Sequence, residues 1–234
     1  MRCCALSEAK GMIIKMRGLF LNQYFTVEKS LRNYVFISVV IVCLLIISNN
    51  EMMLSFATWL PILFMITPAF EALKHESSSG WNKFVLALPI KRSQVVQSHY
   101  IFYSLIMLSG IILTFVLFVL TDLIMGQNQT TTAVYSIMNG VGLALIIGFV
   151  TYPLTYHYGT EKSDMILMMG VLAAIGLFFL SEWIYKGILE NFGAPLSPNT
   201  NHDLLFSSSF LLINLFLFII SYFVTLQIYK RKEF

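Results

Sequence analysis

Long apolar stretches alternate with short polar connections along the whole chain. Six of these stretches are near the roughly 20 residues that a helix needs to cross a bilayer, and they cover about 31–47, 54–70, 100–120, 133–152, 165–184 and 204–228. The last is the clearest, because it is the longest of the six and contains no charged residue. The first has a strongly apolar part of only 35–47, and Arg32 at its boundary would have to extend its charged end toward water. The pattern predicts an all-α membrane protein with six transmembrane helices.

The composition agrees with this pattern and excludes a soluble domain. Of 234 residues, 57% are hydrophobic and 12% are charged, against roughly 45–50% and about 25% in a typical soluble domain. Three cysteines, Cys3, Cys4 and Cys43, lack the CxxC spacing of a metal or redox site.

The basic residues indicate how the chain is oriented. Fourteen of the 15 Lys and Arg residues lie before the first predicted span, in the second-to-third and fourth-to-fifth connections, or after the last span. Only Lys186 lies in the remaining connections. Because positive residues accumulate on the cytoplasmic side of membrane proteins, this distribution predicts a multi-pass protein with both termini in the cytoplasm.

Three segments outside the spans have patterns of their own. Residues 12–30 place apolar side chains at steps of three and four, with Lys and Asn opposite, which predicts an amphipathic helix in the inner interface. The alternative is a cytoplasmic extension of the first span. Residues 181–203 combine a helical pattern over 182–192 with the Gly/Pro/Asn-rich stretch GAPLSPNTN. They predict a short extracellular helical segment before the last span, or else a plain solvated loop.

The third segment, residues 71–99, is the longest cytoplasmic connection. After a break at Ser77–Gly80, apolar residues from Trp81 to Leu88 recur at helical spacing, and Pro89 ends that pattern. Ser93 is a suitable N-cap for a second helix. We therefore expect two short amphipathic helices near the cytoplasmic surface, the alternative being an ordered linker.

A row of small residues marks the fourth predicted span. Gly140, Ala144 and Gly148 recur every four residues, a spacing that lets helices approach closely. The row suits packing within the chain, which we favour, or a dimer contact.

Sites for catalysis and for metals or cofactors are not indicated. The sequence has no GxxxxGK[ST] or HExxH motif and no nucleophile–base spacing. The four histidines, His75, His99, His157 and His202, are scattered over connections and span ends. Acidic residues likewise avoid the span centres, which argues against an ion-coupled carrier or a charged channel filter. The remaining possibilities are a translocator of amphipathic or lipid-like cargo and a structural membrane subunit.

One stretch of the sequence is similar to a known family. Residues 80–96, GWNKFVLALPIKRSQVV, resemble the cytoplasmic loop of small six-span ABC type-2 permeases, and residues 16–20 with 24–29 resemble the N-terminal elbow helix of that family. Within the family, the size and the opening MRGLFLNQYF are most similar to permease subunits of the staphylococcal exporter of phenol-soluble modulins.

The resemblance implies a function and a set of partners. Two such permeases, identical or paralogous, would pair in the bacterial cell membrane, and each would dock on a separate cytoplasmic ABC ATPase that holds ATP and Mg²⁺. The second-to-third loop would act as a coupling helix and the last outer loop would cap the exit. Coupling candidates on this basis are Glu76, Trp81, Lys83, Leu88, Pro89 and Arg92.

The expected cargo is an amphipathic peptide, with no nucleic-acid partner. Alternatives are a permease for lipids or for resistance to antimicrobial peptides, and a non-transport immunity or scaffold protein in the membrane.

Overall fold

The computed structural model describes residues 2–47, 51–79, 91–125, 130–192 and 201–231. These residues form long α-helices and one short 3-10 helix, η1 (Thr160–Lys162). The α-helices are α1 (Arg2–Ile47), α2 (Glu51–Ser78), α4 (Arg92–Met125), α5 (Thr130–Tyr158), α6 (Ser163–Phe192) and α7 (His202–Arg231).

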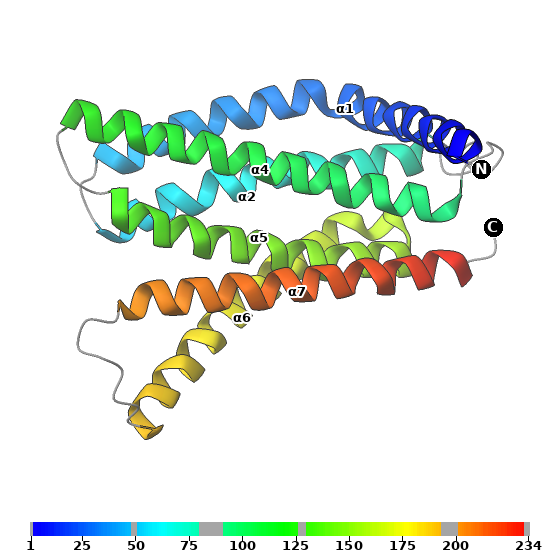
Figure 1. The fold of residues 1–234 in the computed structure, drawn as a ribbon. Helices are drawn as coiled ribbons and strands as arrows, with labels where there is room; N and C mark the ends of the chain where they lie inside the picture. Colours follow the sequence, from blue (N-terminus) through cyan, green and yellow to red (C-terminus); the bar gives the residue numbers. More distant parts are fainter. Residues whose placement is uncertain (1, 48–50, 80–90, 126–129, 193–200, 232–234) are drawn as a thin grey trace.

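The helices form a bundle in which α5 is central. It packs against α2, α4, α6 and α7, while α1 packs against α2 and α4 on the other side. Figure 1 shows the helices running back and forth, so that both chain ends lie at the same end of the bundle. Helix α6 is the exception to this close packing, because it contacts mainly α5 and its last part extends away from α7 (Figure 1).

Five of the six predicted spans are confirmed as helices long and apolar enough to cross a membrane. Among the described residues these are Met53–Glu76, Arg92–Leu120, Ala133–Tyr158, Ser163–Ile188 and His202–Arg231. The first predicted span, 31–47, forms the last part of α1, and its passage through the bilayer stays a prediction. Residues 12–30 are also helical but continue into it without a break, and their place in the interface stays a prediction as well.

Two connecting segments differ from the prediction. We expected a separate short helix after Ser93, but Ser93 is the second residue of α4, which runs unbroken to Met125. The start of α4 is instead stabilised by Gln94, the third residue of the helix, whose side-chain oxygen accepts a hydrogen bond from the Lys91 N–H at 3.0 Å, as the N3 residue of a capping box does. Residues 182–192 are helical as predicted, but as the end of α6. The helix predicted over 81–88 lies outside the described residues.

An aromatic cluster occupies the centre of the bundle. Phe70 of α2, Tyr100 and Tyr103 of α4, Tyr152 of α5 and Phe218 of α7 are all buried. Neighbouring ring centroids lie 4.7–5.6 Å apart, a range in which aromatic pairs add stabilisation beyond the area they bury. The cluster therefore joins four helices at one level.

The hydroxyl groups of this cluster are paired across helices. Tyr100 contacts the hydroxyls of Ser221 and Thr225 at 2.9 and 2.8 Å, and Tyr103 donates to the carbonyl oxygen of Ala144 at 2.5 Å. Because a hydrocarbon core offers no alternative partner, these bonds favour one arrangement of α4 against α5 and α7.

The row of small residues on α5 packs against helices of the same chain. A Cβ atom on Gly148 would lie 2.8 Å from the Phe218 ring and 2.9 Å from the Tyr103 ring. A Cβ on Gly140 would lie 3.1 Å from the Trp59 side chain of α2, and Ala144 between them is fully buried. The absence of side chains here lets the aromatic cluster close on α5.

We predict that Gly148→Ala destabilises the bundle by about 1–3 kcal/mol, the usual cost of an extra methyl group in a filled core. The measurement is the free energy of unfolding of the purified protein in mixed micelles. Gly176→Ala on α6 is the matched control, since a Cβ there meets nothing within 4 Å. Equal effects of the two variants would contradict the close packing at Gly148.

Candidate functional site

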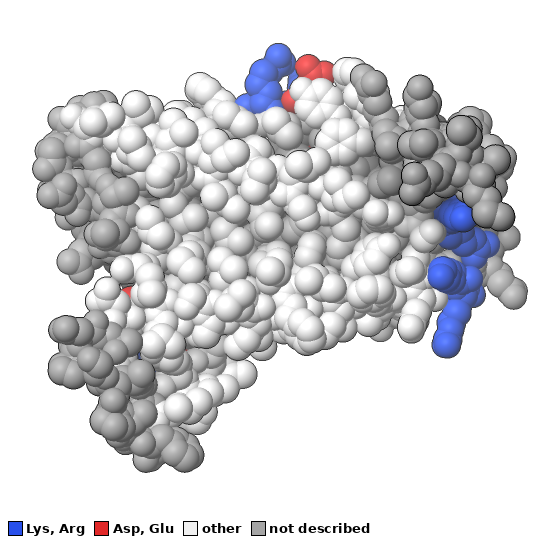
Figure 2. Space-filling model, in the orientation of Figure 1, with Lys and Arg blue, Asp and Glu red and all other residues white. Residues whose placement is uncertain are grey.

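The two ends of the bundle differ in charge. Side chains of Lys74, Lys91, Arg92, Lys230 and Arg231 gather where α2 and α7 end and α4 begins, which we call the basic end. Figure 2 shows this group of Lys and Arg at one end, a small charged group over α1, and otherwise little charge on the visible face. At the opposite end, Lys186 is the only Lys or Arg among the described residues.

A buried polar chain links three helices near the basic end. Glu76 of α2 and His99 of α4 have side chains only 3% and 4% exposed, and Glu76 Oε2 lies 2.9 Å from His99 Nε2. The other imidazole nitrogen, Nδ1, lies 2.6 Å from the hydroxyl of Tyr156 on α5. A neutral imidazole satisfies both contacts when Nε2–H donates to Glu76 and the Tyr156 hydroxyl donates to Nδ1.

Helix α1 is attached to the same region by further polar contacts. Ser30 and Tyr34 both donate to the Glu71 carboxylate of α2, Tyr34 at 3.1 Å. Gln23 is buried and donates to the Ser98 hydroxyl of α4 at 3.3 Å. Specific hydrogen bonds thus position α1 on α2 and α4.

Arg92 connects the first turn of α4 to the last turn of α7. Its Nη1 donates to the carbonyl oxygens of Tyr229 and Lys230 at 3.4 and 3.2 Å. The last carbonyls of a helix lack partners within the helix and carry the negative end of its dipole. A guanidinium group therefore stabilises this helix end while holding two helices together.

The predicted coupling residues are found at the basic end as far as the structure describes them. Glu76 lies near the end of α2 and Arg92 at the start of α4, on either side of residues 80–90. Trp81, Lys83, Leu88 and Pro89 lie outside the described residues.

Sequence reasoning missed two members of the buried chain, His99 and Tyr156. The sequence pattern places His99 among residues of connections and span ends, whereas it is a buried residue of α4. A signal was present, because His99 lies four residues after Val95 and four before Tyr103, which share one helix face. Its partners were not predictable in this way, since Glu76 and Tyr156 are on other helices.

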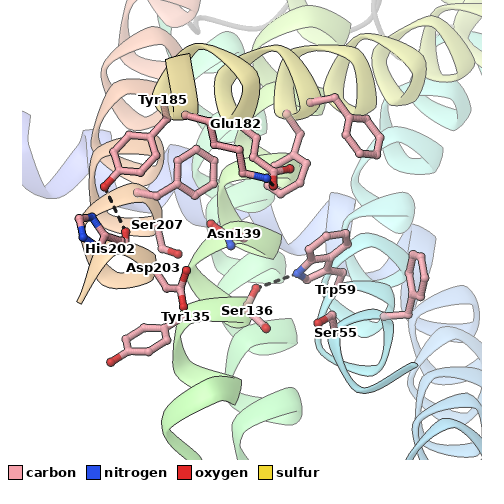
Figure 3. A pocket seen from close by; sticks show the side chains of 15 residues that line it. Ser55, Trp59, Tyr135, Ser136, Asn139, Glu182, Tyr185, His202, Asp203 and Ser207 are labelled. Carbon is pink, nitrogen blue, oxygen red and sulfur yellow. Dashed lines mark hydrogen bonds and ion pairs between the residues drawn. The ribbon is translucent and has the colours of Figure 1, made fainter. Parts of the chain in front are cut away.

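At the opposite end, the starts of α2, α5 and α7 and the last part of α6 enclose a pocket of about 570 Å³, the outer pocket (Figure 3). Aromatic side chains form its apolar walls: Phe56, Trp59, Phe178, Phe179 and Phe206. Its polar lining includes Tyr135, Ser136, Asn139, Glu182, Lys186, His202 and Asp203. This mixture suits a ligand that is itself partly apolar and partly charged.

Hydrogen bonds hold the outer pocket in shape. Trp59 Nε1 donates to the carbonyl of Ser136 at 2.9 Å, which joins α2 to α5. The Tyr185 hydroxyl donates to the carbonyl of His202 at 3.3 Å, which joins α6 to α7 (Figure 3). Among the described residues, no group of three His, Cys, Asp or Glu side chains is placed to hold a metal ion.

The sequence matches a known protein family over most of its length. The model of the ABC-2 family transporter proteins matches residues 18–230. The chain belongs to the ABC-2 transporter family. A comparison with curated proteins gave no match. The family match runs from α1 nearly to the end of α7, so the whole bundle belongs to an ABC-2 permease, a membrane transport component.

We predict a strong energetic coupling between Glu76 and His99 in this permease. Alanine at either position leaves a buried partner without its hydrogen bond, at a cost of about 1–3 kcal/mol. The double variant should cost less than the sum of the single ones, with a coupling energy of about 0.5–3 kcal/mol. The measurement is unfolding of all four proteins in mixed micelles.

The control pair for this cycle is Lys74 and Asp164, which also form a short contact, at 2.6 Å, but are 50% and 79% exposed. Exposed pairs contribute about 0–1 kcal/mol, so the effects of their substitutions should be nearly additive. If the effects at Glu76 and His99 were also additive, the buried contact would contribute no measurable coupling energy.

Proposed function

We propose that this chain is the membrane-spanning permease subunit of an ATP-driven exporter that moves amphipathic peptides out of a bacterial cell. The observation that carries the proposal is the family match across residues 18–230. Energy has to come from a partner, because the sequence has no phosphate-binding motif of its own. Family membership implies a separate ABC ATPase, which would hold ATP and Mg²⁺, and a dimeric arrangement of permeases.

The basic end is the side on which we place the ATPase. An excess of Lys and Arg favours the cytoplasm, and both chain termini lie at this end (Figure 1). The segment between Ser79 and Lys91, the proposed coupling segment, joins α2 to α4 here. Glu76 and Arg92 on either side of it contact α4 and α7 directly. A push on the segment would therefore reach several helices at once.

The outer pocket supports an amphipathic cargo. With the basic end in the cytoplasm, it lies on the external side, where an exported molecule leaves the protein. Phenylalanine and tryptophan side chains line it beside three charged ones. A strictly polar solute gains little from such walls, whereas a peptide with one apolar and one charged face matches them. The resemblance to exporters of phenol-soluble modulins points to the same class of cargo.

The orientation can be tested by cysteine labelling in intact cells. Lys91 and Lys186 are both exposed, at opposite ends of the bundle. In a variant without Cys3, Cys4 and Cys43, a membrane-impermeant maleimide should label Lys186→Cys from outside, and Lys91→Cys only after permeabilisation. Labelling of both positions from the same side would overturn the proposed orientation.

The coupling role of Arg92 can be tested in the assembled transporter. We expect the solubilised chain to co-purify with an ABC ATPase, and Arg92→Ala to lower peptide export by between about 2-fold and about 30-fold, the range expected for loss of 0.5–2 kcal/mol of coupling. Lys162→Ala is the matched control, because its exposed side chain lies in η1, which contacts α2, α5 and α6. Export without an associated ATPase, or unchanged export by Arg92→Ala at normal permease levels, would contradict the respective part of the proposal.

A further inference from the structure

A second cavity lies beside the outer pocket. It measures about 340 Å³ and lies between α6 and α7, and we call it the side crevice. Its apolar lining consists mainly of aliphatic side chains, among them Ile146, Leu177, Ile184, Ile188, Ile213 and Leu217. The crevice exists because α6 extends away from α7 toward this end of the bundle (Figure 1).

Two aromatic side chains separate the cavities. Tyr185 of α6 and Phe206 of α7 line both the outer pocket and the side crevice. Their ring centroids lie 5.3 Å apart, and the Tyr185 hydroxyl contacts the first turn of α7 (Figure 3). Side chains rather than backbone thus divide the space, and side chains change rotamer without unfolding a helix.

The outer pocket has charged side chains in its lining, whereas the side crevice is mainly apolar. Among the described residues, the outer pocket is lined by the carboxylates of Glu182 and Asp203 and by one ammonium group, that of Lys186, which pairs with Glu182 at 2.7 Å. Asp203 is exposed in the first turn of α7, and among the described residues it forms no ion pair with a Lys or Arg side chain. Its carboxylate therefore suits a ligand that donates hydrogen bonds and carries positive charge. The aromatic walls favour the same ligand through cation–π attraction.

We propose that the outer pocket and the side crevice form one binding site for a cationic amphipathic peptide. A lysine ammonium of the peptide lies in the outer pocket near Asp203, and neighbouring apolar side chains enter the side crevice past Tyr185 and Phe206. Cavities of about 570 and 340 Å³ hold a few side chains rather than a whole peptide. The site therefore recognises a short amphipathic segment of the cargo, and it rests on the proposed function.

The first experiment measures binding to the full-length chain in lipid nanodiscs. The probe is a synthetic 20-residue helical peptide of leucine and lysine with a fluorophore at one end. We expect Asp203→Asn to weaken binding about fivefold, the effect of about 1 kcal/mol at an exposed ion pair. The matched control is Asp164→Asn, an exposed acid in the first turn of α6 at the basic end, which should bind like the wild type.

The probe also has a control of its own, the same peptide with glutamine in place of lysine. It should bind the wild type and Asp203→Asn equally. Equal binding of the lysine peptide to both proteins would overturn the electrostatic part of the site, because charge at Asp203 would then be irrelevant to recognition.

The second experiment locates the peptide. A photoreactive residue on its apolar face should cross-link to α6 between 177 and 188 and to α7 between 206 and 217, and mass spectrometry identifies the positions. Replacing exposed Trp183, which lines neither cavity, by alanine should leave the cross-links unchanged. Cross-links elsewhere on the chain, or an amine lipid that occupies the site and is not displaced by the peptide, would overturn the proposal.

A measurement of ATP-driven transport distinguishes a failure of this binding site from a failure of the proposed function. If the assembled transporter exports the peptide while cross-links fall outside the two cavities, the site is wrong and the function stands. If cross-links fall in the cavities but no ATPase drives movement, the site stands and the exporter function is wrong.

Discussion

Polar groups inside a hydrocarbon core have no water to bond, and this bundle is organised around satisfying them internally. Glu76, His99 and Tyr156 complete one chain of contacts, and Tyr100 completes another with Ser221 and Thr225. Apolar packing alone discriminates weakly between helix arrangements in lipid, because lipid tails are as apolar as leucine. The polar contacts favour one register for each helix pair, and small residues on α5 make room for the rings that carry them.

The polar contacts between helices are distributed unevenly between the two ends of the bundle. Near the basic end, hydrogen bonds connect α1 with α2 and α4, and Arg92 connects α4 with α7. At the opposite end, α6 and α7 meet through ring contacts of Phe178 and Tyr185 and through one hydrogen bond from Tyr185 to the His202 carbonyl. One end is therefore suited to receiving a displacement as a unit, and the other to opening between two helices. An ATP-driven permease needs both properties, since work enters on one side and cargo leaves on the other.

The two cavities lie at the end of the bundle where α6 and α7 diverge. Where α6 leaves α7, aromatic and charged side chains that close packing would have buried instead line open space. Charged side chains line the outer pocket and mainly aliphatic ones line the side crevice, a division like that between the polar and apolar faces of an amphipathic helix. The proposed class of cargo is thus tied to the shape of the bundle, because both cavities are lined by α6 and α7.

Much of this architecture was predictable from the order of residues alone. Apolar runs long enough to span a bilayer identify the membrane helices, since the hydrophobic effect acts on each run separately, and the lopsided placement of Lys and Arg predicts a sidedness. The segment 80–96 and the opening of the chain were sufficient to suggest the ABC-2 family. Small residues at 140, 144 and 148 predicted close packing of helices. The sequence pattern missed Gly142, where a Cβ would lie 2.4 Å from the Phe210 ring.

Other features were decided only by folding. Glu76 and His99 are separated by 23 positions, and His99 and Tyr156 by 57, so no local pattern pairs them. The extension of α6 to Phe192 and the continuity of α4 from Arg92 are likewise seen only in the folded structure, whereas the local sequence breaks suggested separate short helices. The outer pocket draws its walls from four helices. Local periodicity shows which face of a helix is apolar, but only packing of all helices together decides which faces meet and where they fail to meet.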